Sequence, residues 1–139
     1  MKIVARKLFD RLVTRERQVI EIQNSSLCLV VGIVFLLDGD SLYSRFPDTY
    51  RYMEWLPSAV WGAIYTLAGV AHLAALYFGW RMLRKHILLV KCGLWVFLAY
   101  CVVSGDPAAV SGYFYVIFAF VAMRAFFRIQ VLKIEERDA

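Results

Sequence analysis

Four long apolar stretches constrain the fold of this chain more than any other feature of its sequence. They cover residues 22–38, 58–80, 86–103 and 107–127. A helix needs about 20 apolar residues to cross a bilayer, because each residue adds about 1.5 Å of length. Composition agrees, since 61% of the residues are apolar and 19% are charged, against about 45–50% and about 25% in a soluble domain. We therefore expect an all-α, polytopic membrane protein with a four-transmembrane-helix bundle over residues 22–127.

Positive charges are distributed unevenly over the two sides that these spans define. All but two of the 16 Lys and Arg residues fall on the side that holds both chain ends, and the exceptions are Arg45 and Arg51. In membrane proteins the cytoplasmic segments carry the excess of Lys and Arg. The asymmetry predicts a multi-pass protein of the bacterial inner (cytoplasmic) membrane with both termini in the cytoplasm. Because topology accounts for the charge, we expect the lipid bilayer as a partner and no nucleic acid.

The segments that flank the predicted bundle differ in character. Residues 1–23 predict an amphipathic helix, with Leu8 and Leu12 on an apolar side and Arg6 and Arg11 on the opposite side. A helix of this kind lies in the headgroup layer of a membrane. We expect a cytoplasmic interfacial helix, and the alternative is an arm that binds a partner or perturbs the membrane. Residues 128–139 predict a short cytoplasmic tail.

Two of the predicted spans carry stripes of small and polar residues at helical spacing. Such stripes let helices approach closely and supply hydrogen bonds in lipid. A stripe can face a helix of the same chain or a neighbouring copy, so the sequence is compatible with a homo-oligomer. The helix-packing or pore-lining candidates are Ser58, Gly62, Tyr65, Thr66, Gly69 and His72 in the second span, and Ser111, Tyr115, Ala119 and Ala122 in the fourth.

Ionisable residues inside a membrane span are functional candidates by default. Lys91 and Arg124 lie about one turn from the inner ends of their helices, so we expect them to snorkel to the headgroups as interfacial cations. His72 lies deeper. This position predicts that the His72 side chain is buried, neutral and hydrogen-bonded to another helix, with Tyr100 and Thr66 as candidate partners. A proton relay is the less favoured role, because such carriers usually have an Asp or Glu and none lies inside a predicted span, since Asp38 is the last residue of the first.

The connection between the first and second spans is rich in aromatic residues. Tyr and Trp favour the membrane–water boundary, where one end of the ring is apolar and the other is wet. The simplest interpretation is an aromatic belt, with a short helix from about Pro47 to Trp55. The alternative is a contact surface for an extracytoplasmic protein partner, with Tyr50, Tyr52 and Trp55 as the candidate contacts.

Motifs of catalysis and cofactor binding do not stand out in this sequence. Cys28, Cys92 and Cys101 lack the C-x-x-C spacing, and there is no Ser-His-Asp set, P-loop or Gly-rich phosphate loop. His86, the second of the two histidines, falls at a membrane edge, so the two do not suit a b-type haem. We expect no enzyme activity, no catalytic residues, no cofactor and no metal.

From the second span onward the chain reads AGVAHLAALY, RMLRK, a Trp-containing span and GDPAAVSGY. This pattern resembles small multi-span membrane proteins of bacteriophages and prophages, of the holin-like or superinfection-exclusion type. The resemblance implies an inner-membrane protein that self-assembles and alters membrane permeability or blocks phage entry. The residues leave two alternatives open. One is a small channel or transporter subunit with a polar path around His72, and the other is a scaffold that recruits a partner through the outer aromatic loop.

Overall fold

The computed structural model describes the backbone of residues 2–138 and the side chains of residues 18–131. This part of the chain is helical and contains no strand. In lipid a backbone must satisfy its own N–H and C=O groups, and a helix does so within one segment. The helices are α1 (Lys2–Arg45), α2 (Pro47–Tyr50), α3 (Ser58–Tyr77), α4 (Arg81–Gly105) and α5 (Val110–Asp138).

Four of these helices contain segments long and apolar enough to cross a membrane: Gln18–Arg45, Ser58–Tyr77, Arg81–Gly105 and Val110–Val131. The predicted all-α fold with four spans is therefore confirmed. Glu21 lies one residue before the predicted start of the first span at residue 22, on the same unbroken helix.

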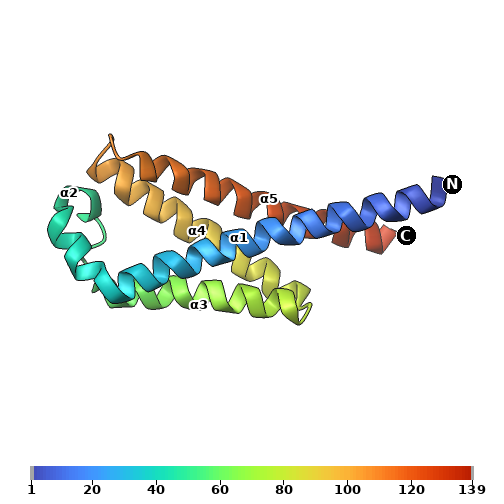
Figure 1. Cartoon of the computed structure of the whole chain (residues 1–139), viewed down its shortest axis with the longest axis horizontal. Coiled ribbons are helices and arrows are strands. Elements are labelled where there is room, and N and C mark those ends of the chain that lie inside the picture. The colour runs from blue at the N-terminus through green and yellow to red at the C-terminus, as the bar shows by residue number, and fades with distance from the viewer. Residues whose placement is uncertain (1, 139) are drawn as a thin grey trace.

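Helix α1 runs without a break from Lys2 to Arg45. The predicted amphipathic segment 1–23 and the predicted first span thus belong to one helix, whose N-terminal part extends beyond the turn between α3 and α4 (Figure 1). The apolar and basic sides predicted for the first turns lie outside the described side chains. Helix α5 similarly continues through most of the predicted tail, to Asp138.

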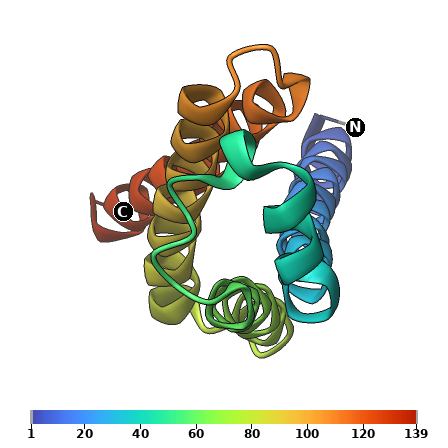
Figure 2. The same cartoon turned by 90° about the vertical axis from the view of Figure 1, so that its left-hand side faces the viewer.

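The four long helices form two antiparallel pairs, α1 with α3 and α4 with α5. Viewed along the bundle, α1, α3, α4 and α5 follow one another around its circumference, and α2 crosses one end (Figure 2). Both chain termini lie at the opposite end (Figure 1). We name the two ends the α2 end and the termini end, and we name the contact between the two pairs the inter-pair interface.

Glycines bring α1 and α3 into backbone contact. A Cβ atom added at Gly62 would lie 2.7 Å from the backbone N of Leu36 and 2.8 Å from the backbone O of Gly32. A Cβ at Gly69 would lie 2.7 Å from Cγ of Leu29. Because backbone atoms cannot move aside, Gly62 requires glycine, as at other close helix crossings in membranes, whereas a Cβ at Gly69 would displace the side chain of Leu29.

The connections at the ends of the helices have recognisable local causes. Helix α3 ends where Gly79 adopts a φ of 69°, and the N–H of Trp80 donates to the carbonyl of Ala75 at 3.0 Å. This is the Schellman pattern that glycine commonly supplies after a helix. Between α4 and α5, the N–H of Ala108 donates to Oδ1 of Asp106 at 3.0 Å, which forms an Asx turn. The predicted fourth span therefore starts at Val110 rather than at Pro107.

Candidate functional site

A cluster of ionisable and hydroxyl side chains lies inside the bundle, towards the termini end. We name it the polar cluster, and it consists of Glu21 and Ser25 from α1, His72 from α3, and Arg84 and Lys91 from α4. Ser25, His72 and Lys91 have no exposed surface, and Glu21 is 5% exposed. Charged side chains at such depth are costly in a membrane unless they pair with one another. Three helices therefore converge on one group of mutually compensating charges.

Glu21 and Arg84 form the part of the polar cluster nearest the termini end. Arg84 donates through Nε to Oε2 of Glu21 at 2.7 Å and through Nη2 to Oε1. A fork of two parallel hydrogen bonds to a carboxylate is the strongest ion pair that arginine makes. The side chain of Arg84 is 24% exposed, so this pair also connects the cluster to the surface of the molecule.

Lys91, His72 and Ser25 form the deeper part of the polar cluster. Nζ of Lys91 lies 2.9 Å from Nδ1 of His72 and 3.0 Å from Oγ of Ser25. Oγ of Ser25 lies 2.7 Å from the same Nδ1 atom and 2.8 Å from the carbonyl oxygen of Glu21. On the opposite edge of the imidazole, Nε2 lies 3.3 Å from Oε2 of Glu21, without the alignment of a hydrogen bond. His72 thus lies between an amine and a carboxylate.

Asn24 extends the polar contacts to α5. Its Nδ2 donates to the backbone carbonyl of Phe118 at 3.3 Å, and its Oδ1 accepts from Nε1 of Trp95 at 3.4 Å. Asn24 is 4% exposed. The amide therefore connects α1 to both helices of the other pair.

Aromatic rings fill the inter-pair interface between the polar cluster and the α2 end. The rings of Tyr65 and Trp95 are 5.8 Å apart, and those of Trp61 and Phe97 stack at 4.9 Å. Tyr65 and Trp95 have no exposed surface. The hydroxyl of Tyr65 donates to the carbonyl of Leu94 at 2.7 Å. In this conformation a layer of packed rings separates the polar cluster from the α2 end.

One sequence-based prediction about the ionisable residues is wrong. Lys91 does not snorkel to the headgroups, because α4 directs it into the inter-pair interface, where His72 and Ser25 provide acceptors. The structure also supplies an acidic partner for His72, because Glu21, one residue before the predicted first span, is buried beside it. Arg124 is exposed on α5, and its contact with the headgroups stays a prediction.

The predicted burial of His72 against another helix is confirmed, but its predicted partners are wrong. Tyr100 is 61% exposed, so it faces away from the interior. Oγ1 of Thr66 has no hydrogen-bond partner among the described residues and packs against Gly32 at the contact between α1 and α3. The partners of His72 come from α1 and α4 instead, which a single-helix pattern cannot indicate.

The two stripes of small residues are used mainly within the chain. In the second span, Gly62, Thr66 and Gly69 pack against α1, and Ser58 donates to Oδ1 of Asp40 on α1 at 2.7 Å. In the fourth span, Ala119 and Ala122 are buried and Tyr115 stacks on Trp95 at 5.8 Å. Ser111 is exposed. The stripes therefore need no neighbouring copy to explain their composition.

The loop at the α2 end divides the three predicted contact residues. Tyr50 is half-buried, with its ring 5.9 Å from the ring of Phe35, and this burial raises the pKa of its hydroxyl. Tyr52 and Trp55 are 44% and 67% exposed. The helix in this loop is shorter than predicted, because α2 covers Pro47–Tyr50 and turns follow it.

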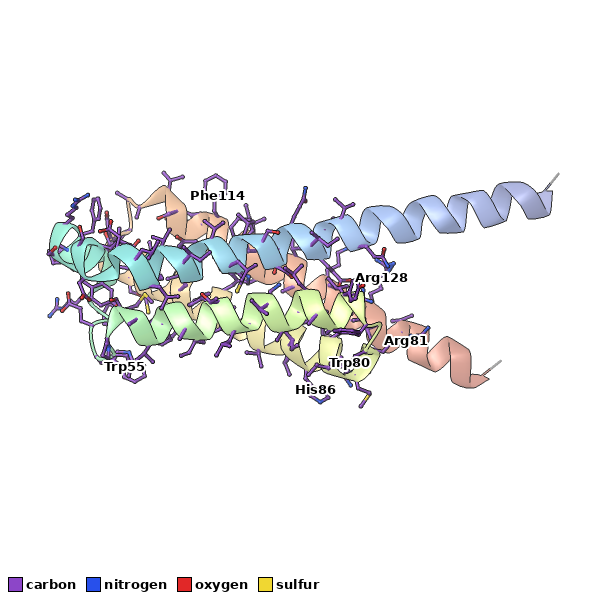
Figure 3. The ribbon with its side chains drawn as sticks, turned by 60° about the horizontal axis from the view of Figure 1, so that its bottom comes forward. Trp55, Trp80, Arg81, His86, Phe114 and Arg128 are labelled. Carbon is purple, nitrogen blue, oxygen red and sulfur yellow. The ribbon has the colours of Figure 1, made fainter. Side chains whose placement is uncertain are left out.

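Exposed tryptophans mark both ends of the bundle. Trp55 lies at the α2 end and Trp80 near the turn between α3 and α4 (Figure 3), and both are more than half exposed. Exposed Trp at two levels along a bundle of apolar helices is typical of the two interfaces of a bilayer. His86 and Arg81 lie near Trp80 (Figure 3), at the same level.

The sequence contained a signal for the residues that were missed. Small and polar residues recur at spacings of three, four or seven positions along α1, at Glu21, Asn24 or Ser25, Cys28, Gly32 and Gly39. This spacing places them along one face of a helix. Asn24 already lies within the predicted first span, and extending that span by one turn at its N-terminal end would have added Glu21 to the same face.

Comparisons with known proteins leave the site to be interpreted on its own geometry. No family model matches the chain, and neither curated proteins nor solved structures gave a match. Among the described side chains, Glu21 and His72 bring two metal-ligating groups together, and no third His, Cys, Asp or Glu joins them. The polar cluster offers hydrogen bonds, charge and exchangeable protons.

Proposed function

We propose that this multi-pass membrane protein is a small channel or transporter subunit of a bacterial inner membrane and that the polar cluster is its working site. The observation that supports this proposal is the burial of Glu21, His72 and Lys91 in contact with one another within predicted membrane spans. Intramembrane ionisable groups that face a bundle interior commonly mark ion pathways and proton relays. A purely structural role would be served at lower cost by apolar side chains.

The orientation of the chain belongs to the same proposal. The excess of Lys and Arg at the termini end favours a cytoplasmic location for both termini. The polar cluster then lies in the cytoplasmic half of the membrane, and Arg84 is its member nearest the cytoplasm. A reporter domain that works only in the cytoplasm should be active when it is fused to either terminus. Activity of a reporter that works only in the periplasm would reverse this orientation.

The holin-like or phage-exclusion role and the scaffold role stay predictions from the sequence. Small residues on α3 were one reason to expect self-assembly, and that reason loses weight because these residues pack against α1 of the same chain. Tyr52 and Trp55 are available to a partner at the α2 end, but lipid headgroups suit such side chains equally well. The buried polar cluster favours transport over both roles.

The proposal can be tested with the full chain in phospholipid vesicles. A gradient of H⁺, Na⁺, K⁺ or Cl⁻ would be imposed across the vesicle membrane, and a voltage-sensitive dye would report the membrane potential that results. We expect a response to at least one gradient from the wild type, and its loss in His72→Asn. The matched control is His86→Asn, because His86 is exposed and its Nδ1 lies 2.8 Å from the carbonyl oxygen of Met82 on its own helix. Wild-type vesicles that behave as empty vesicles under all four gradients would refute the proposed function.

A further inference from the structure

The hydrogen-bond donors around His72 fix the position of its proton. A lysine ammonium group has only donors, so Nδ1 of His72, 2.9 Å from Nζ of Lys91, must act as an acceptor. The proton of a neutral imidazole then resides on Nε2, which faces Oε2 of Glu21 at 3.3 Å. This is the tautomer that passes a proton when one arrives at Nδ1 and another leaves from Nε2.

We infer that the species handled by the polar cluster is the proton and that it passes from Lys91 through His72 to Glu21. This inference rests on the proposed transport function and names its substrate. Nζ of Lys91 gives a proton to Nδ1 of His72, while Nε2 of His72 gives its proton to Oε2 of Glu21. The ammonium becomes a neutral amine, the carboxylate becomes a carboxylic acid, and the imidazole stays neutral but changes tautomer.

The packing of the polar cluster selects the proton over larger ions. Ser25, His72 and Lys91 have no exposed surface. A proton needs only hydrogen bonds that already exist or that form after a small movement. Nε2 of His72 and Oε2 of Glu21, 3.3 Å apart, would form their hydrogen bond after such a movement. A hydrated cation would have to separate Lys91 from His72 and Ser25, and it would meet the positive charge of the amine.

Arg84 is a positioning residue for the last step. Its two hydrogen bonds hold the carboxylate of Glu21 beside His72. They also favour the ionised acceptor, because a guanidinium stabilises a carboxylate. Since Arg84 is 24% exposed, its movement towards the termini end would let Glu21 release the proton there.

The other groups around the path complete its electrostatics. His72 is faced by Glu21 and Ser25 from α1 and by Arg84 and Lys91 from α4. From α1, Cys28 also lies close enough to Lys91 to interact with its charge. On the side of the α2 end, the rings of Tyr65 and Trp95 close the path in this conformation.

The test uses the full chain in vesicles with a controlled membrane potential. For a proton-selective path, a tenfold proton gradient should shift the reversal potential by about 59 mV, and gradients of Na⁺, K⁺ or Cl⁻ should not shift it. Lys91→Met and Glu21→Gln should each lower the proton flux by about a hundredfold or more, as expected for the loss of a proton-transfer group. Lys85→Met is the matched control on α4, because Lys85 lies over the ring of Phe126 and outside the polar cluster.

Arg84 variants separate positioning from simple charge. Arg84→Lys keeps the positive charge and loses the fork, and Arg84→Gln loses both. A positioning role predicts that the flux falls in both variants and that its pH profile moves in Arg84→Gln more than in Arg84→Lys. Identical pH profiles in the two variants would leave Arg84 no part in the relay.

The outcomes distinguish the inference from the proposed function. A flux that follows Na⁺, K⁺ or Cl⁻ would overturn the relay and leave transport standing. If the wild type shows no flux, transport fails, and infrared difference spectra between two pH values then decide the relay. A carboxylic acid band that disappears in Glu21→Gln and shifts in His72→Asn would retain proton exchange at the site. Spectra without such a band would overturn the relay as well.

Discussion

The two halves of the inter-pair interface are held together by different forces. Towards the termini end the pairs meet through Glu21 with Arg84 and Lys91 with His72. Towards the α2 end they meet through stacked rings, such as Trp61 on Phe97. One half depends on an ion pair and polar hydrogen bonds, and the other on the shape of large side chains. A small membrane bundle can thus keep a rigid packed half and an ionisable half in the same interface.

The difference has an energetic consequence in lipid. Helices in a membrane gain little from apolar burial, so packing and interhelical hydrogen bonds carry their association. In the aromatic half, a change of side chain removes contacts in proportion to the volume lost. In the polar half, the loss of one partner leaves a buried charge without compensation, which is more costly than the loss of the whole pair.

The largest effect is expected when Glu21 is removed from the polar half. Glu21→Ala leaves Arg84 without its carboxylate, and it should lower the unfolding free energy by about 3–5 kcal/mol. Equilibrium unfolding in mixed micelles would measure the change. Glu54→Ala is the control, because Glu54 is exposed in the loop, and it should have little effect. Equal losses in the two variants would remove the distinction between the two halves.

A change in the aromatic half should have a smaller effect. Trp95→Phe keeps a ring but loses volume and the bond from Nε1 to Asn24, so a loss of about 1–2 kcal/mol is expected. Trp80→Phe is the matched control, because Trp80 is 55% exposed. If Trp95→Phe lowered the unfolding free energy as much as Glu21→Ala, shape would matter as strongly as charge. The two halves of the interface would then not differ in the way described.

Removing a single hydroxyl group from the aromatic half should lower the unfolding free energy by a still smaller amount. Tyr65→Phe preserves the ring and removes the 2.7 Å bond to the carbonyl of Leu94. The expected loss is about 1 kcal/mol or less, typical of an interhelical hydrogen bond in a membrane. The control Tyr100→Phe changes an exposed hydroxyl and should show no loss under the same unfolding conditions.

Lys91→Met should separate stability from flux. The substitution leaves the Glu21–Arg84 pair intact and removes a buried charge that has no carboxylate in hydrogen-bond contact among the described residues. The unfolding free energy should therefore stay within about 1 kcal/mol of the wild-type value or rise above it. Proton flux in vesicles should nevertheless be lost. A large destabilisation with flux retained would assign Lys91 a structural role.

Much of the fold could be predicted because each step needs only one helix. Apolar length predicted the four spans, and the stripe on the second span predicted that His72 would be buried. Glu21 lies one residue outside the predicted first span, so hydropathy gave no reason to expect it inside the bundle. Its burial beside His72 supplies the acidic group whose absence from the predicted spans disfavoured a proton relay.

The sequence by itself determined the helical class, the four apolar spans and the uneven distribution of charge, because these follow from length, periodicity and composition. It also determined that glycines on the second span would allow a close helix contact. The tertiary structure decided which helix fills that contact and where the charges go. Snorkelling of Lys91 is the lower-energy choice for an isolated helix in lipid. The arrangement of α1 and α3 beside α4 reverses that choice, because it places Ser25 and His72 within hydrogen-bond distance of the amine.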